Sequence, residues 1–258
     1  MRIVSLVPSL TKTLFDLGLG DSVVGCTSFC VDPPKETKKI RKIGGTKNPN
    51  INAIKELRPT HILVNSEENR LEDVNHLRQM ASVLETFPKD IVMVPTMLRN
   101  LAVFLGDDFG FSKNCQKVAI QIDDLVAKLQ EQKQPESNDY LYFIWRNPLM
   151  CAGHETYIES LFRLIGFRNA VKRGIRYPEI TWEEIDQLRP RFIFLSSEPF
   201  PFRKRHAQEI LHKINYRPFI VKVDGRMFSW HGSLSLGALR HLDSGMSGAQ
   251  WWEESLMA

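Results

Sequence analysis

The chain has 258 residues, of which 43% are hydrophobic and 25% charged, as in ordinary globular proteins. A formal net charge of +4, without a dense basic stripe, argues against nucleic-acid binding. No segment reaches the ~18 consecutive apolar residues that span a membrane, and 1–8 is too short in its apolar part for a signal peptide. We therefore expect a cytoplasmic protein, or a periplasmic or membrane-surface one if a signal peptide has been removed.

The first half of the chain alternates short apolar runs with helical patterns. The first run ends at Pro8, which stops a strand and opens a loop, and Asp32-Pro33-Pro34 forms a rigid turn. Strands are predicted at 3–7, 22–26, 62–64 and 91–94, and helices at 11–19, 52–57 and 74–84. Strands that alternate with helices predict parallel pairing in a layered α/β structure.

The longest helical pattern lies in the middle of the chain, at 112–129. Its apolar residues recur every three or four positions and form one stripe along ~27 Å of helix. Ser112 is suited to cap its N-terminus, and the polar segment 130–139 with Pro135 ends it. The second half continues with strands and helices and ends in a tail, 243–258, without a clear pattern. Its strands are predicted at 140–145, 192–195 and 220–223, and its helices at 155–165 and 233–242.

A short segment that ends in Leu-Arg-Pro, followed by an apolar run and Ser-Glu, occurs twice. The copies begin at Asn50 and Ile180, and Pro59 and Pro190 are 131 residues apart, about half the chain. A second similarity relates residues 14–18 (LFDLG) to residues 161–166 (LFRLIG). The repeat predicts two Rossmann-like α/β lobes related by internal duplication, with a ligand cleft between them. The expected organisation is an N-terminal lobe at 1–110, a connecting long helix at 111–136, and a C-terminal lobe with tail at 137–258.

Several short motifs carry a family resemblance. They are 2–11 (RIVSLVPSLT), 17–21 (LGLGD), Val24-Gly25, Asp32-Pro33-Pro34, Gly44-Gly45 and Asn48-Pro49-Asn50. The chain resembles the helical-backbone (class III) substrate-binding proteins of ABC importers, most closely those for vitamin B12 and iron siderophores, from Arg2 to about Leu242. The resemblance implies two α/β lobes joined by one long backbone helix. It also implies a monomer that binds a corrinoid or related metal chelate between its lobes, without catalysis and without an intrinsic cofactor.

The resemblance also places the ligand site on loops that follow strands. The implied ligand-binding residues are Phe29, Trp145, Arg146, Met150, Tyr177, Phe228, Trp230 and His231. The aromatic residues would either supply apolar contact to the ligand or fill the core. Arg146 would hold an anionic or amide group or form a surface salt bridge, and His231 would donate to cobalt or iron or serve as a structural histidine. Thr46 and Asn65 are polar where the vitamin B12 binders tend to carry aromatics.

Importer-coupled members of this family carry one exposed glutamate per lobe, which meets arginines of the membrane permease. Glu183 fits this role in the second copy of the repeat. The matching residue of the first copy is Asn52, which is neutral, although Glu56 lies one helical turn further on. The docking pattern for a permease is therefore broken in the first lobe.

Catalytic and metal-binding motifs are absent from the sequence. It contains no nucleophile elbow, P-loop, GxGxxG after a strand or HExxH, and no set of histidines and carboxylates with metal-ligand spacing. We therefore expect a binding protein that is not an enzyme and has no metal site of its own. Two alternatives remain open: a ferric siderophore or haem binding protein, and a cytoplasmic enzyme or chaperone of cofactor processing on the same scaffold.

Of the four cysteines, Cys26 and Cys30 are four positions apart. This spacing permits a disulfide or half of a metal site. In a reducing compartment they would instead be two unrelated small apolar residues.

Overall fold

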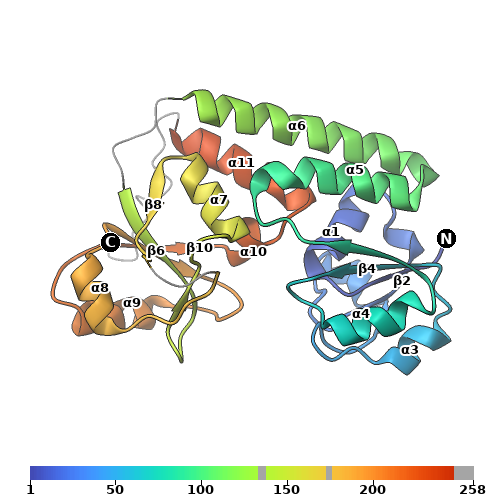
Figure 1. Cartoon of the computed structure of the whole chain (residues 1–258), viewed down its shortest axis with the longest axis horizontal. Helices are drawn as coiled ribbons and strands as arrows, with labels where there is room; N and C mark the ends of the chain where they lie inside the picture. Colours follow the sequence, from blue (N-terminus) through green and yellow to red (C-terminus); the bar gives the residue numbers. More distant parts are fainter. Residues whose placement is uncertain (133–137, 173–175, 247–258) are drawn as a thin grey trace. The chain divides into compact units, whose positions relative to one another are not determined.

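The computed structural model describes residues 1–132, 138–172 and 176–246, so Trp251 and Trp252 of the tail lie outside the described residues. By their internal contacts these residues form two compact units. Unit 1 consists of Met1–Pro88, Val92–Asp123 and Trp230–Leu236, and unit 2 of Lys89–Ile91, Asp124–Ser229 and the described part of Gly237–Ala258. The long helix α6 (Phe111–Glu131) continues from one unit into the other, as the sequence predicted (Figure 1).

Unit 1 is built on a five-stranded sheet in the order β3-β2-β1-β4-β5, with every pair parallel. The strands are β1 (Ile3–Ser5), β2 (Val23–Cys26), β3 (Arg41–Lys42), β4 (His61–Asn65) and β5 (Ser82–Thr86). The chain leaves β1 toward β2 and β3 and later returns to the other side of β1 with β4. The strand order therefore reverses between β1 and β4, and ligands of open α/β sheets bind at the carboxyl ends of the strands near such a switch point.

Helices cover both faces of the sheet of unit 1. Ile54 and Val74, from α3 and α4, pack with Val4 and Ile62 of the sheet in one apolar cluster. Figure 1 shows α3 and α4 on the opposite side of the sheet from α1 and α5. The helical segments up to this point are α1 (Pro8–Leu17), η1 (Gly20–Ser22), α2 (Pro34–Thr37), α3 (Ile51–Glu56), α4 (Leu71–Arg78), η2 (Ile91–Met93), α5 (Val94–Leu105) and η3 (Asp108–Gly110).

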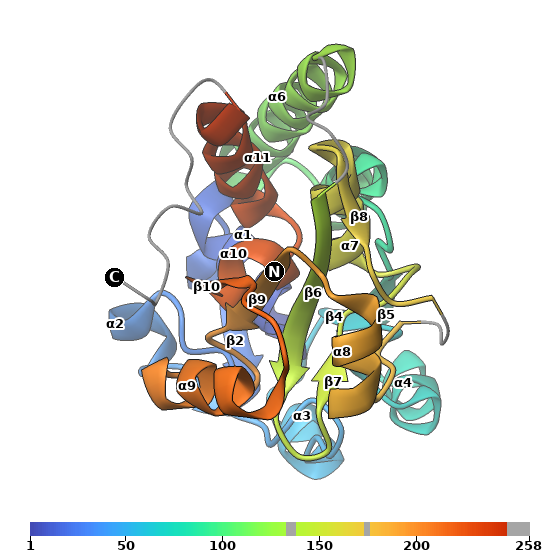
Figure 2. The same cartoon turned by 90° about the vertical axis from the view of Figure 1, so that its left-hand side faces the viewer.

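Unit 2 holds a second five-stranded sheet, centred on the long strand β6 (Figure 2). Strand β9 pairs parallel with β6 and with β10, β8 pairs parallel with the start of β6, and β7 forms an antiparallel hairpin with its end. The strands are β6 (Asn138–Trp145), β7 (Met150–Cys151), β8 (Phe167–Asn169), β9 (Phe192–Ser196) and β10 (Phe219–Val223). The helices are α7 (Tyr157–Leu164), α8 (Trp182–Leu188), α9 (Lys204–Lys213), α10 (Gly225–Ser229) and α11 (Ser233–Met246).

The two faces of this second sheet differ in chemistry because successive side chains of a strand point to opposite faces. Leu141 and Ile193 belong to an apolar cluster with residues of α8 and α9. Tyr140 and Phe194 instead contact Phe162 of α7. The ring centre of Phe162 lies 4.6 Å from that of Tyr140 and 4.7 Å from that of Phe194. One face is therefore covered mainly by aliphatic side chains, with Phe143 and Phe202 among them, and the other by a cluster of aromatic rings.

The internal duplication is confirmed by the structure. Strand β4 (His61–Asn65) and strand β9 (Phe192–Ser196) follow the two copies of the repeat, and each lies parallel beside the first strand of its unit. Within two residues of the end of the helix before each strand, an arginine adopts the left-handed conformation, Arg58 with φ 46° and Arg189 with φ 44°. A proline follows each arginine and restricts the preceding residue, so the same backbone signal ends both helices.

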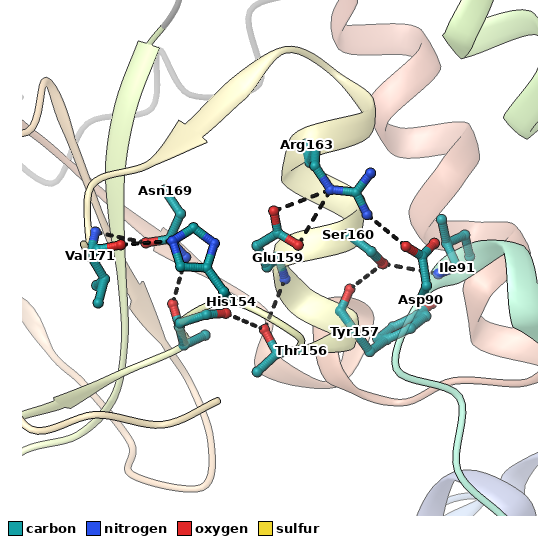
Figure 3. A network of polar contacts seen from close by, with 12 residues as sticks. Asp90, Ile91, His154, Thr156, Tyr157, Glu159, Ser160, Arg163, Asn169 and Val171 are labelled. Carbon is teal, nitrogen blue, oxygen red and sulfur yellow. Dashed lines mark hydrogen bonds and ion pairs between the residues drawn. The ribbon is translucent and has the colours of Figure 1, made fainter. Parts of the chain in front are cut away.

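A polar network joins segment 89–91 to the rest of unit 2 (Figure 3). Arg163 donates to Asp90 Oδ2 at 2.6 Å, and the backbone N–H of Ile91 donates to Ser160 Oγ at 2.9 Å. Both partners lie on α7, and Thr156 caps the same helix by accepting from the N–H of Glu159 at 3.2 Å. The three-residue segment that follows β5 is therefore held by an ion pair and a backbone hydrogen bond.

The sequence expectations for 74–84 and 91–94 are wrong. Helix α4 ends at Arg78, and Ser82–Thr86 is the edge strand β5. The sequence did not reveal this change because no glycine or proline lies between the two elements. Residues 91–94 are not a strand but begin a helical stretch, η2 (Ile91–Met93) followed by α5 (Val94–Leu105). The apolar run continues at helical spacing through Leu98, Leu101 and Leu105, and Pro95 occupies the first turn, where a proline is tolerated.

Candidate functional site

The carboxyl edge of the sheet of unit 1 carries an exposed aromatic side chain on the loop after β2. Phe29 is 59% exposed. Its loop is fixed by a hydrogen bond from the N–H of Ser28 to the carbonyl of Gly44 at 2.8 Å. The ring lies beside Gly45, where a methyl group would come within 3.5 Å of it. Phe29 is therefore a large apolar side chain presented to solvent by a backbone with defined hydrogen bonds.

The switch point of unit 1 brings together two residues far apart in the sequence. Asn65 ends β4, and its Nδ2 lies 3.2 Å from Nε2 of His231. Both side chains are buried, at 3% and 7% exposure. Because an amide nitrogen only donates, Nε2 accepts, and the ring proton is placed on Nδ1.

Burial lowers the pKa of His231 to about 4, partly opposed by a hydrogen bond to its own backbone. A neutral imidazole at neutral pH agrees with the acceptor role of Nε2. The structure therefore favours a structural role for His231 over metal ligation, because Nε2 already accepts a hydrogen bond from Asn65. Within residues 1–132, 138–172 and 176–246, no three His, Cys, Asp or Glu side chains gather into a group that could hold a metal ion.

Trp230 precedes His231 and is also mostly covered, with 9% exposure. Both residues belong to the short segment Trp230–Leu236, which packs with unit 1 although it lies near the end of the described chain. The segment is anchored there by the N–H of Ser233, which donates to Thr13 Oγ1 at 3.1 Å. Sequence reasoning did not anticipate this placement.

In unit 2, the end of β6 and the hairpin to β7 hold three of the predicted residues. Trp145 is 40% exposed, its indole N–H donates to the carbonyl of Asn147 at 3.0 Å, and its ring meets Phe200 edge-on at 6.0 Å. Met150 pairs with Trp145 across the hairpin and is half-buried. Trp145 therefore offers a ring face with a fixed orientation, supported from one side.

Arg146 forms an ion pair with a residue of α9 that the sequence did not single out. Both oxygens of the Glu209 carboxylate accept from its guanidinium, Oε2 from Nε at 3.0 Å and Oε1 from Nη2. The guanidinium also lies 5.9 Å from the ring centre of Trp182. A bidentate pair occupies the guanidinium donors that would otherwise hold a ligand anion. The salt-bridge alternative for Arg146 is the one that the structure favours.

Tyr177 and Phe228 differ in accessibility. Phe228 is 1% exposed and sits in the aromatic core, with its ring centre 5.3 Å from that of Phe162, so it has the environment of a core residue. Tyr177 is half-buried, and the guanidinium of Arg176 lies 5.6 Å from its ring centre. Of the predicted aromatics, Phe29, Trp145 and Tyr177 therefore retain surface for a ligand.

A cavity of about 300 Å³ opens in unit 1 beyond the carboxyl end of β5. Its apolar rim includes Val92 and Met93, which are 50% and 45% exposed. Sequence reasoning missed it because it treated 91–94 as a strand. The lining residues are Leu84, Glu85, Thr86, Phe87, Pro88, Val92, Met93, Thr96, Met97 and Asn100.

The two copies of the repeated helix differ in the charge of their exposed first turns. Glu183 is exposed in the first turn of α8, where the N-terminus of a helix favours negative charge. Asn52 is exposed at the matching position of α3. Glu56 is paired with Arg41, whose Nη2 donates to Glu56 Oε2 at 2.5 Å. Glu56 therefore does not supply a free carboxylate in place of the neutral Asn52.

None of the helices in the described ranges has the length and apolar character needed to cross a lipid bilayer.

Comparisons with known proteins agree with this architecture. The sequence model of the family described as "Periplasmic binding protein" matches residues 3–216. A vitamin B12-binding protein of Vibrio vulnificus (strain YJ016) is 23% identical over 197 residues, which cover 76% of this chain and 71% of that protein. The uncharacterised ABC transporter substrate-binding lipoprotein YvrC of Bacillus subtilis (strain 168) is 26% identical over 196 residues, covering 73% and 61%.

Solved structures show the same fold. The periplasmic vitamin B12 binding protein BtuF of Vibrio cholerae gives a TM-score of 0.77 at 19% identity and covers 96% of this chain and 97% of its own. The periplasmic haem-binding protein RhuT from Roseiflexus sp. RS-1 gives 0.78 at 19% identity, covering 98% and 99%. The predicted fold class, two α/β lobes joined by a long helix, is confirmed.

The expected cytoplasmic location is wrong. The relatives and structural neighbours are periplasmic proteins or a substrate-binding lipoprotein, and these point to an extracytoplasmic location. The expectation rested on the short apolar part of residues 1–8 and on the neutral Asn52 at the docking position.

Proposed function

This chain belongs to the periplasmic binding protein family, and from that premise we propose that it captures a small metal chelate for an ABC importer. The first candidate ligand is a corrinoid of the cobalamin type. The protein binds it without performing a reaction on it. The proposal is supported by relatives that are vitamin B12-binding proteins and by the vitamin B12 binding protein among its structural neighbours.

The observation that carries the proposal is the pair of exposed aromatic side chains at the carboxyl ends of strands, one in each unit. Phe29 follows β2 and is 59% exposed, and Trp145 ends β6 and is 40% exposed. Single exposed aromatic residues are common on protein surfaces, so the support comes from their position: both rings lie at the carboxyl ends of strands, where α/β sheets bind ligands. Each ring that packs on a flat macrocycle buries roughly 150 to 250 Å² and supplies affinity without requiring a charge.

Haem is a second candidate ligand, supported by one specific feature of unit 2. Tyr177 is half-buried, and the guanidinium of Arg176 lies 5.6 Å from its ring centre. A tyrosinate oxygen is one of the ligands that haem iron accepts, and a guanidinium beside it balances the negative charge. The periplasmic haem-binding proteins among the structural neighbours agree with this alternative.

We further propose that α8 contacts a membrane permease. Glu183 lies exposed in the first turn of α8, and Glu184 and Asp186 belong to the same helix. Glu184 caps the helix and Asp186 accepts from Asn215, so Glu183 is the carboxylate proposed to meet an arginine, which binds a carboxylate through two parallel hydrogen bonds.

The test is calorimetric titration of the full chain with cyanocobalamin, haemin and a ferric hydroxamate siderophore, each in separate experiments. We expect cyanocobalamin to bind with a Kd of about 1 μM or tighter, and the other two at least tenfold more weakly. Tight binding of haemin with a shifted Soret band, lost in Tyr177→Phe but kept in Tyr216→Phe, would assign haem instead. Lack of heat with all three ligands would reject a metal-chelate function.

A further inference from the structure

Two buried cysteines lie four residues apart at the carboxyl end of β2 in unit 1. Cys26 is the last residue of the strand. The chain then turns back, with the N–H of Cys30 donating to the carbonyl of Thr27 at 3.1 Å. This turn brings both residues to the ammonium group of Lys42, whose Nζ lies 3.2 Å from Cys26 Sγ and 2.8 Å from the carbonyl oxygen of Cys30. Both are free and buried, at 0% and 1% exposure.

The two sulfurs have different polar neighbours. Lys42, which pairs with Cys26 across the sheet, places its Nζ 3.2 Å from Cys26 Sγ and donates to the carbonyl of Cys30 at 2.8 Å. The hydroxyls of Thr11 and Thr27 lie 3.1 Å from Cys30 Sγ. The cation is thus directed at Cys26, and neutral hydroxyls surround Cys30.

The acidities follow this arrangement. The hydrogen bond with Cys30 lowers the pKa of Cys26 to about 7, helped by Lys42 and opposed by burial. The same hydrogen bond, together with burial, raises the pKa of Cys30. Cys26 is therefore partly ionised at neutral pH, whereas Cys30 stays protonated.

The other two cysteines of the chain provide an internal contrast. Burial raises the pKa of both Cys115 and Cys151 to about 12. Cys115 lies within α6, and Cys151 Sγ meets the backbone carbonyl of Pro178 at 3.8 Å. Thiols in such surroundings are poor nucleophiles.

We propose that Cys26 and Cys30 form a reversible disulfide, in which Cys26 is the nucleophile and Cys30 the resolving thiol. The Cys26 thiolate attacks one sulfur of a small disulfide and expels the other as a thiolate, which takes up a proton. Cys30 then loses its proton, attacks Cys26 Sγ and expels the second small thiol. The two cysteines are oxidised to one disulfide, and the small disulfide is reduced to two thiols.

The compartment supports the proposal. Disulfides form and persist outside the cytoplasm, where the relatives of this chain reside. Adjacent thiols with one ionised member are oxidised first in such surroundings. Because both sulfurs are buried, the exchange proceeds through opening of the turn at 27–30, whose middle residues Ser28 and Phe29 are exposed.

A Cys26–Cys30 disulfide would close a small ring that contains Phe29. Closing this ring restricts the backbone that presents the exposed aromatic side chain, so the oxidised and reduced forms hold Phe29 with different freedom. Only this consequence, a redox-dependent ligand affinity, rests on the proposed function. The disulfide itself can be tested without any ligand.

The experiment uses the full chain, reduced with dithiothreitol, desalted and incubated with oxidised glutathione at about pH 7. The protein is then denatured in iodoacetamide and mapped by mass spectrometry. We expect the peptide that contains both Cys26 and Cys30 to lose two hydrogens and escape alkylation, while Cys115 and Cys151 become alkylated. Alkylation of all four cysteines after prolonged incubation would overturn the proposal, as would a bridge that involves Cys115 or Cys151.

Variants separate the roles of the two thiols. Cys30→Ser is expected to stop at a mixed disulfide between Cys26 and glutathione, whereas Cys26→Ser should remain unmodified. Cys115→Ser, the matched control, should form the bridge as the parent does. Equal glutathionylation of Cys26→Ser and Cys30→Ser would show that Cys26 is not the nucleophile. Circular dichroism checks that each variant is folded.

Lys42 is a positioning residue, and its effect depends on pH. Lys42→Gln should slow the first step by about threefold or more near neutral pH, because less Cys26 is ionised. The difference should vanish at alkaline pH, where the thiolate forms in both proteins. A slowing that is equal at every pH would mean that Lys42 acts only on the structure of the turn. Titration of reduced and oxidised protein with cyanocobalamin then tests the consequence for Phe29 separately.

Discussion

At the scale of single residues, exposure separates the aromatic side chains that the sequence grouped together. Phe29 and Trp145 are open to solvent, while Phe228 and Trp230 are buried. The resemblance placed all four on loops after strands, but loop position does not determine whether a side chain points outward or into a core. That information comes from the packing of distant segments, such as the contact of Phe228 with Phe162.

Phe29→Ala is expected to weaken binding of the ligand identified by titration by about 1 to 2 kcal/mol, or roughly five- to thirtyfold in Kd. The free energy of unfolding should change by less than about 0.5 kcal/mol, because the side chain is exposed. Calorimetry and urea denaturation measure the two quantities. Phe109→Ala removes another exposed ring, 82% accessible and outside the proposed site, and should leave affinity unchanged. Equal affinities of Phe29→Ala and the parent would exclude Phe29 from the site.

His231 makes the stability of unit 1 depend on pH. Its folded pKa of about 4 lies below the ordinary value of 6.5 because the ring is buried. As the pH falls from 6.5 toward 4, the unfolded chain takes up a proton that the folded chain does not, so the folded state loses stability. The contribution present above pH 6.5 and lost by pH 4 amounts to about 3 kcal/mol.

His231→Gln keeps an acceptor for Asn65 Nδ2 and removes the titration. Urea denaturation measures how much unfolding free energy each protein loses between pH 7 and pH 4. We expect the variant to lose about 3 kcal/mol less than the parent over this range. The slope, and not the stability at one pH, is the quantity to compare. Parallel curves for the two proteins would contradict a buried neutral imidazole.

At the scale of elements, the short helix of the second repeat depends on its cap. Thr181 Oγ1 accepts from the N–H of Glu184 at 3.2 Å, and the Glu184 carboxylate accepts from the N–H of Thr181 at 2.9 Å. Thr181→Ala should lower the free energy of unfolding by about 1 kcal/mol, because it leaves a helix N–H without its acceptor. Thr181→Ser keeps the hydroxyl and should lose less than half of that. Chemical denaturation of the three proteins distinguishes a capping role from a loss of side-chain packing.

Elements were predictable from the sequence where the local signals agreed. The helix of the first copy and the strands of both copies were located within a residue or two, because an Arg-Pro stop and a buried apolar run coincide. The change from α4 to β5 was missed because both are half-exposed and polar, with neither glycine nor proline between them. The start of α5 was mistaken for a strand because four apolar residues in a row suit either structure.

At the scale of the whole molecule, ligand binding should appear as thermal stability. A ligand that binds only the folded state adds about 2.7 kcal/mol at a concentration of 100 times its Kd. For a chain of this size we expect a rise of about 5 to 10 °C in the melting temperature. Differential scanning fluorimetry with cyanocobalamin measures the rise, and adenosine serves as a non-binding control. An unchanged melting temperature at saturating cyanocobalamin would contradict the corrinoid proposal.

The sequence predicted the two-lobed fold and the family, because duplication and the N-terminal motifs are properties of the chain itself. It did not predict that Trp230–Leu236 packs with unit 1, nor that Arg146 pairs with Glu209. Both depend on contacts between residues more than sixty positions apart, for which a single sequence contains no local signal.

The unequal charges of the repeated helices have a consequence for recognition. Helix α3 contributes Lys55 and Glu56, which cancel, whereas α8 contributes Glu183, Glu184 and Asp186. A duplicated molecule whose halves were alike could meet a two-fold symmetric partner in either of two equivalent poses. Here exchanging the halves would place the carboxamide of Asn52 where the partner would otherwise meet the carboxylate of Glu183, so the two poses would differ in free energy. Any partner that contacts both helices would therefore distinguish the two orientations of the chain.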